Sequence, residues 1–108
     1  MKNQNQTIDE GYIKFNCQWI KEPLSFKIPE QLLFWRDKMY ELKQIGYYPE
    51  LKIGYGNISI KTEQGILISG TQTGNIYPIQ PEHFTLVIDY NLEQNMVVCQ
   101  GLIKASSE

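Results

Sequence analysis

The sequence predicts one α/β domain of the α+β layered kind, in which a mainly antiparallel central sheet is flanked by helices. Two pairs of short apolar segments are each joined by a few turn-forming residues, and one segment in the first half of the chain has helical periodicity. Strands joined through short turns pair antiparallel, because parallel neighbours need a long crossover. The 108 residues suffice for one domain. We expect a disordered polar head over residues 1–10 and the domain over residues 11–108.

The first half of the chain predicts one strand and one helix. Apolar and polar side chains alternate over residues 13–20, which is typical of a half-buried strand. Apolar side chains then recur at helical spacing at Leu32, Trp35, Met39 and Leu42. We predict a helix over residues 30–45, ended by Gly46 as its C-cap, with this apolar and aromatic stripe facing the core. Residues 47–49 are predicted to form a turn.

The second half of the chain predicts two β-hairpins. They are formed by residues 58–60 with 66–68 and by residues 86–90 with 96–99. Between the hairpins, residues 69–74 form a loop rich in glycine and threonine, and a short helical turn is expected around Glu82.

Charge and cysteine content exclude several classes of protein. Ten Lys and Arg against twelve Asp and Glu give a net charge of -2, and no basic stripe is present, so nucleic acid and membrane are not expected as partners. No apolar run approaches the roughly 18 residues of a membrane span. Cys17 and Cys99 lack the spacing of a redox or zinc motif, and no apolar signal segment precedes them. We expect two buried thiols in a cytoplasmic protein.

Three short segments place a small or glycine residue beside an amide or hydroxyl. They are residues 56–59, 69–74 and 105–108. Such segments let the backbone approach a ligand while its N–H groups donate, although each one alone is also typical of an ordinary turn or tail. The last segment has the composition of a helix N-cap, where unpaired amides and the helix dipole attract anions. It is therefore a candidate phosphate-binding edge.

Taken in order, these segments resemble the class II aldolase/adducin family, which includes fuculose-phosphate aldolase. The resemblance is found in residues 56–60, 66–74, 81–87 and 99–108. It covers essentially the second half of the chain, and the predicted helix lies where the family has its first long helix. The resemblance implies that a sugar phosphate is bound by Asn57, by Thr73 with Gly74 or else Thr71, and by Ser106 and Ser107. It also implies that Glu108 corresponds to the general acid/base of the aldolases.

The resemblance further implies zinc, which the family binds through histidines that follow this glutamate. This sequence has one histidine, His83, in a turn that lies away from the metal in the family, so we interpret His83 as structural. One imidazole and no cysteine cluster do not make a zinc site with three protein ligands. We expect no cofactor within this chain, although zinc is expected for the complete family member, and no activity of the chain alone.

Three hypotheses about function follow. The first is a C-terminally truncated aldolase-like domain that keeps part of a sugar-phosphate site. The second is one half of a split metal-dependent lyase or epimerase, whose histidines come from a complementing chain. The third is a non-catalytic, adducin-like assembly module, for which a homo-oligomer is expected. We rank the first hypothesis highest.

Overall fold

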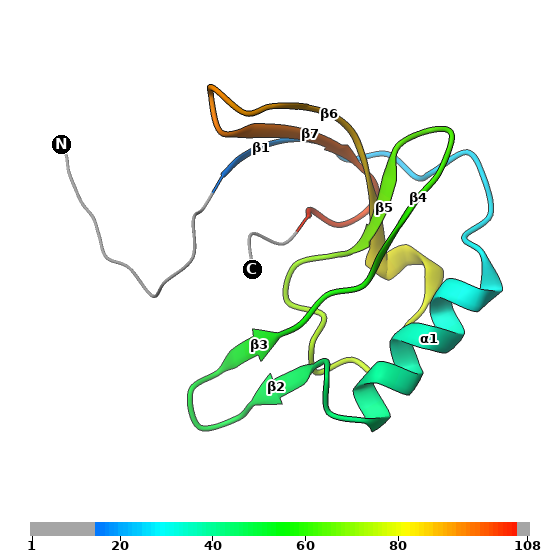
Figure 1. Cartoon of the computed structure of the whole chain (residues 1–108), viewed down its shortest axis with the longest axis vertical. Helices are drawn as coiled ribbons and strands as arrows, with labels where there is room; N and C mark the ends of the chain where they lie inside the picture. Colours follow the sequence, from blue (N-terminus) through cyan, green and yellow to red (C-terminus); the bar gives the residue numbers. More distant parts are fainter. Residues whose placement is uncertain (1–14, 106–108) are drawn as a thin grey trace, which may run out of the picture.

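Five strands form the main sheet of this protein, in the order β1-β7-β6-β5-β4 (Figure 1). The computed structural model describes residues 15–105. The strands are β1 (Asn16–Ile20), β4 (Ser59–Lys61), β5 (Ile66–Ser69), β6 (Phe84–Asn91) and β7 (Met96–Gln100). The described residues form an α+β domain, as predicted, but the domain is mostly sheet and has one α-helix where flanking helices were predicted. The expected head over residues 1–10 lies outside the described residues.

The pairing of β1 with β7 makes the sheet mixed. These two strands run parallel, with Cys17 opposite Val97 and Trp19 opposite Cys99, whereas the pairs β4–β5, β5–β6 and β6–β7 are antiparallel. The indole Nε1 of Trp19 donates a hydrogen bond to the Gly101 carbonyl at 2.9 Å, just beyond the end of β7. The expectation of a mainly antiparallel sheet is confirmed, with one parallel edge strand added.

Helix α1 (Glu30–Glu41) is shorter than predicted. It begins after Pro29, whose φ of −58° suits a helix start, and its C-cap is Leu42. Lys43 then takes a left-handed φ of 63°, so the helix ends before the predicted residue 45. Gly46 is not a C-cap but the first residue of a strand. A Cβ at Gly46 would lie 2.5 Å from the Tyr55 hydroxyl, so a larger residue here would displace the Tyr55 ring.

The predicted core face of α1 is partly wrong. Leu32 is buried, but Trp35 and Leu42 are 49% and 57% exposed, and Phe34 beside them is also exposed. The buried position next to Leu32 is taken instead by Arg36, which is 0% exposed. The main core unites α1, the sheet and the loops that flank them, and consists of Ile28, Leu32, Leu67, Ile79, Phe84 and Leu86.

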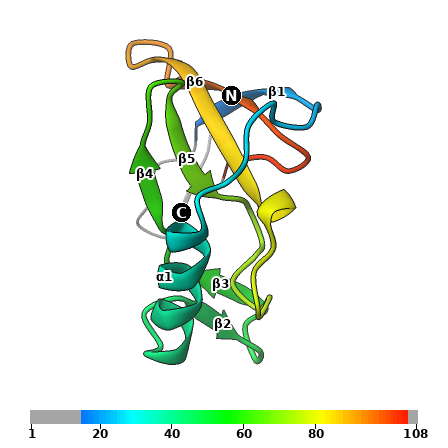
Figure 2. The same ribbon diagram turned by 90° about the vertical axis from the view of Figure 1, so that its right-hand side faces the viewer.

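A second, two-stranded sheet stands where the sequence analysis predicted only a turn. Strand β2 (Gly46–Tyr48) pairs antiparallel with β3 (Ile53–Tyr55), and the turn between them includes Lys52 at a φ of 56°. The rings of Tyr48 and Tyr55 lie with their centroids 4.7 Å apart. Figure 2 shows α1 and this hairpin together at the end of the molecule opposite the β6–β7 turn.

The other predicted elements of the second half are confirmed. The hairpins β4–β5 and β6–β7 are present, and the short helical turn is η1 (Pro81–His83). The imidazole Nδ1 of His83 accepts the Gln80 backbone N–H at 2.9 Å, so this side chain caps the start of η1. No helix within residues 15–105 has the length and apolar character needed to cross a lipid bilayer.

Candidate functional site

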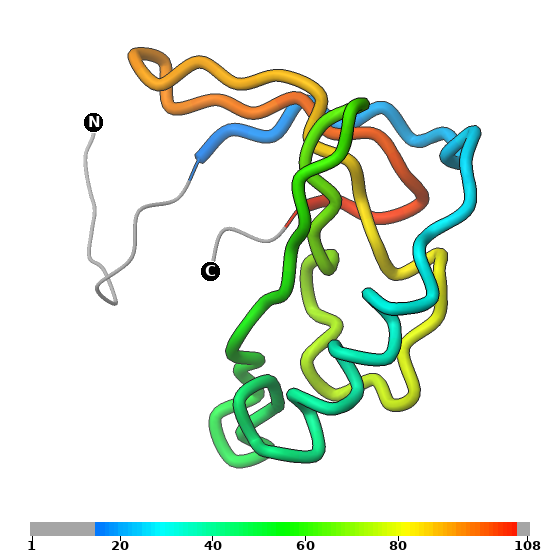
Figure 3. Tube along the Cα trace, turned by 45° about the vertical axis from the view of Figure 1, so that its right-hand side comes forward, coloured from blue at the N-terminus to red at the C-terminus, as the bar shows by residue number. Residues whose placement is uncertain are grey.

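The segment 69–74 and Ala105, the first residue of the segment 105–108, meet at one corner of the fold. Gly70 and Ala105 form an isolated antiparallel bridge, and the Thr71 N–H donates to the Lys104 carbonyl at 2.8 Å. The Gly70 N–H donates to the His83 carbonyl, also at 2.8 Å. In Figure 3 the last described residues return to the loop that follows β5. Residues that are more than thirty positions apart in sequence are thus neighbours.

The third segment joins the same corner through Asn57. The Ser69 hydroxyl donates to Asn57 Oδ1 at 3.1 Å and accepts the Ile58 N–H at 3.2 Å. Ser69 is the last residue of β5 and is 2% exposed, so it attaches the Asn57 side chain to the start of the 70–74 loop. We call Asn57, Ser69, Gly70, Thr71 and residues 104–105 the loop corner.

The structure distinguishes the three loop residues implied as phosphate ligands. Thr73 is 4% exposed, and its hydroxyl donates to the Gly70 carbonyl at 2.9 Å, so it stabilises the loop. Gly74 packs on the second sheet, where an added Cβ would lie 2.2 Å from the Gly46 carbonyl oxygen. Thr71 is half-buried and lines a cavity. The geometry therefore favours Thr71 as the residue of this loop that contacts a ligand.

The cavity at the loop corner has a volume of about 400 Å³. It is lined by Phe15, Asn16, Cys17, Thr71, Lys104 and Ala105. Among the described residues that line the cavity, Lys104 is the only charged one, and its ammonium lies 5.9 Å from the centre of the Trp19 ring. This part of the lining therefore suits an anionic ligand.

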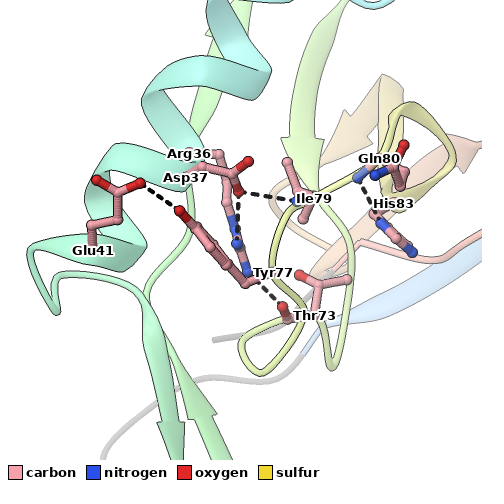
Figure 4. A network of polar contacts seen from close by, with 8 residues as sticks. All are labelled: Arg36, Asp37, Glu41, Thr73, Tyr77, Ile79, Gln80 and His83. Atoms are coloured by element: carbon pink, nitrogen blue, oxygen red, sulfur yellow. Dashed lines mark hydrogen bonds and ion pairs between the residues drawn. The ribbon is translucent and has the colours of Figure 1, made fainter.

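Arg36 on α1 binds the end of the 69–74 loop at Thr73. The sequence analysis did not predict this role. Arg36 Nη2 donates to the Thr73 carbonyl at 2.7 Å, and Nη1 lies 3.2 Å from Asp37 Oδ1 (Figure 4). The same Asp37 oxygen accepts the Ile79 N–H at 3.0 Å, so the pair holds both ends of the segment from Thr73 to Ile79. Burial lowers the pKa of Arg36, and the bond to Asp37 opposes this effect. The signal was available, because Arg36 follows Leu32 by four residues and shares its helix face.

A second polar contact joins the same helix to this segment. The Tyr77 hydroxyl donates to Glu41 Oε2 at 2.5 Å (Figure 4). The Tyr77 ring also stacks on Tyr40, with centroids 4.8 Å apart. This hydrogen bond is the main reason why the pKa of Glu41 is lowered and the pKa of Tyr77 is raised. It therefore favours a charged carboxylate beside a protonated phenol.

The remaining predicted site residues, Ser106, Ser107 and Glu108, lie outside the described residues. Within residues 15–105, no group of three or more His, Cys, Asp and Glu side chains is placed to hold a metal ion. The described residues therefore do not fit a zinc ion. No family model, curated protein or solved structure matches this chain.

Proposed function

We propose that this chain is a domain of the class II aldolase/adducin type and binds a sugar phosphate at the loop corner. The observation that supports this most is the bridge between Gly70 and Ala105, because it unites two segments that the resemblance implies in phosphate binding. A phosphate dianion is best held by several short donors rather than by one charge. The bond from Ser69 to Asn57 brings the third segment to the same place.

The proposal gives each residue of the loop corner a defined task. Lys104 supplies the positive charge of the cavity, and Thr71 supplies a hydroxyl at its wall. Ser106 and Ser107 follow Ala105 directly, so we propose that they complete the phosphate site and that Glu108 acts as the acid/base. Catalysis in this proposal requires a group of metal-binding histidines from outside the described residues, contributed by another chain or segment.

A second candidate function, assembly, is favoured by exposed aromatic side chains on α1. Phe34 and Trp35 are 57% and 49% exposed and contact each other edge to face, with centroids 5.2 Å apart. Large exposed aromatic side chains are enriched where proteins associate. We propose that this face binds a complementing chain or a second copy, and a sedimentation measurement of Trp35→Ala against the wild-type chain tests it.

The sugar-phosphate proposal is tested by titrating the full chain with ribulose 5-phosphate while amide chemical shifts are recorded. The shifts are expected at Thr71, Lys104 and their neighbours. Lys104→Ala should raise the dissociation constant about tenfold, because one charge-assisted contact to the phosphate is lost. Lys61→Ala, at an exposed position of β4, is the matched control and should leave binding unchanged. Shifts that avoid the loop corner, or equal binding by Lys104→Ala, would refute the proposal.

A further inference from the structure

Two cysteines lie against each other at the edge of the main sheet. Cys17 on β1 and Cys99 on β7 are 82 positions apart in sequence, and their Sγ atoms are 2.7 Å apart. Both are free thiols. The contact is a hydrogen bond in which either sulfur can donate, and the roughly 2.05 Å S–S bond of a disulfide needs the two sulfurs to approach by less than about 1 Å. The sequence spacing gave no sign of the pair, because the parallel pairing of β1 and β7 creates it.

The two thiols differ in access. Cys99 is 0% exposed, whereas Cys17 is half-buried and lines the cavity of the loop corner. A small oxidant that enters this cavity therefore meets Cys17 first. Cys99 is then the nearest nucleophile to the oxidised sulfur. This arrangement of an accessible thiol and a buried partner suits a two-step exchange.

The two cysteines also connect β1 to β7, which is the parallel pair at the edge of the main sheet. Strand β1 is at the end of the strand order and pairs only with β7 within the described residues. A covalent bond there would fix this edge strand to the body of the sheet. It would also fix one wall of the cavity, because β1 contributes Asn16 and Cys17 to the lining.

We propose that Cys17 and Cys99 form a reversible disulfide, by exchange with a low-molecular-weight disulfide, that locks β1 onto β7. The Cys17 thiolate attacks one sulfur of oxidised glutathione, which forms a mixed disulfide and releases one glutathione. The Cys99 thiolate then attacks Cys17 Sγ and releases the second glutathione. Two protein thiols are oxidised to one disulfide, and one glutathione disulfide is reduced to two thiols, whose protons come from the cysteines. Reduced glutathione reverses both steps.

The surroundings of Cys17 set the rate of this exchange. Burial and the neighbouring Cys99 raise the pKa of Cys17 to about 11, so little thiolate is present near neutral pH. Because the thiolate is the attacking species, the exchange is slow. The pair therefore responds to sustained oxidation rather than to a brief pulse. Formation of the bond does not depend on the proposed sugar-phosphate binding.

The experiment uses the full chain equilibrated with oxidised glutathione, alkylated, and examined by mass spectrometry. The expected product is a monomer that has lost two hydrogen atoms and yields a crosslinked peptide joining Cys17 to Cys99. Its Tm should exceed that of the reduced chain by at least about 5 °C, since the bond closes a long loop. Dithiothreitol should restore the lower Tm.

Two single variants keep the test decisive. Cys17→Ser and Cys99→Ser should each take up glutathione or stay reduced, and the oxidised and reduced forms of each should have Tm values within about 1 °C. Comparing the two redox states within one variant removes the effect of the substitution itself, and Cys17→Ser affects only a half-buried site. An oxidised wild-type chain with two alkylatable thiols, only glutathione adducts, only dimers, or an unchanged Tm would overturn the proposal.

Discussion

Substitution of Arg36 by alanine should destabilise the domain by about 2 to 4 kcal/mol. The guanidinium is fully buried and donates to the Thr73 carbonyl at 2.7 Å, and a buried hydrogen bond of a charged group contributes about 1.5 to 3 kcal/mol. The contact with Asp37 adds less, about 0.2 to 1 kcal/mol, because the Asp37 side chain is 21% exposed and water screens the pair. Lost packing of the Arg36 stem adds to this, whereas removal of its unpaired, buried Nε offsets part of the loss.

The measurement is urea unfolding followed by tryptophan fluorescence, with the free energy obtained from the linear dependence on urea. Lys38→Ala is the matched control, because Lys38 lies on the same helix in an exposed pair with Glu41 at 3.4 Å, and it should cost less than about 0.5 kcal/mol. Arg36→Met keeps the apolar stem and should cost less than Arg36→Ala. A loss below about 1 kcal/mol in Arg36→Ala would refute the role assigned to this buried cation.

Two further predictions concern the Tyr77 contact and the glycines. Tyr77→Phe should return the pKa of Glu41 towards its ordinary value, measured by carboxyl NMR titration. The lowered Glu41 pKa stabilises the fold above the unfolded value of 4.5, and this contribution is lost as pH falls through the folded pKa. The raised Tyr77 pKa stabilises the fold below pH 10.0, and this contribution is lost as pH rises through the folded pKa of Tyr77. The free energies of unfolding of the variant and wild-type chains should therefore differ most between about pH 4.5 and pH 10.0. An equal difference at acid pH would contradict the assignment. Gly74→Ala should cost about 1 to 3 kcal/mol in urea unfolding, because the new Cβ would lie 2.2 Å from the Gly46 carbonyl oxygen. Gly54→Ala, whose nearest neighbour would be 3.7 Å away, should cost less than about 1 kcal/mol, and equal losses in the two variants would contradict the packing.

Local chemistry predicted the hairpins but not the contacts that organise them. The strands β4 to β7 were predictable because their side-chain patterns and the short turns between them can be recognised within a few residues of sequence. The parallel pairing of β1 with β7 was not, since it joins residues such as Asn16 and Met96 that are far apart in sequence and depends on no local signal. Strands β2 and β3, with the sequences Gly-Tyr-Tyr and Ile-Gly-Tyr, do not alternate apolar with polar side chains and so carry no period-two signal. The helix end was wrong because the chain leaves the helix at Leu42 and Lys43, and Gly46 begins β2 instead of capping the helix.

The sequence predicted which segments form the candidate site, but not how their residues are arranged in space. The order of the motifs, through the family that they resemble, named Asn57 and the 70–74 loop, and this membership stays a prediction. Only the fold reveals that Thr73 is turned inward to Gly70 while Thr71 lines the cavity. The buried role of Arg36 was missed because the core face of the helix was inferred from its apolar and aromatic residues alone. Its position four residues after Leu32 was the available indication.

The parallel edge of the sheet has a consequence for the order of folding. Strand β1 is made early in synthesis. Its partner β7 becomes available only after α1, the hairpins β2–β3 and β4–β5, and strand β6 have left the ribosome. Closing a loop of this length carries an entropic cost that the hairpins, being local, do not bear. We expect β1 to dock last, so that during biogenesis the flank of β7 stays open to chaperones or to a neighbouring nascent chain.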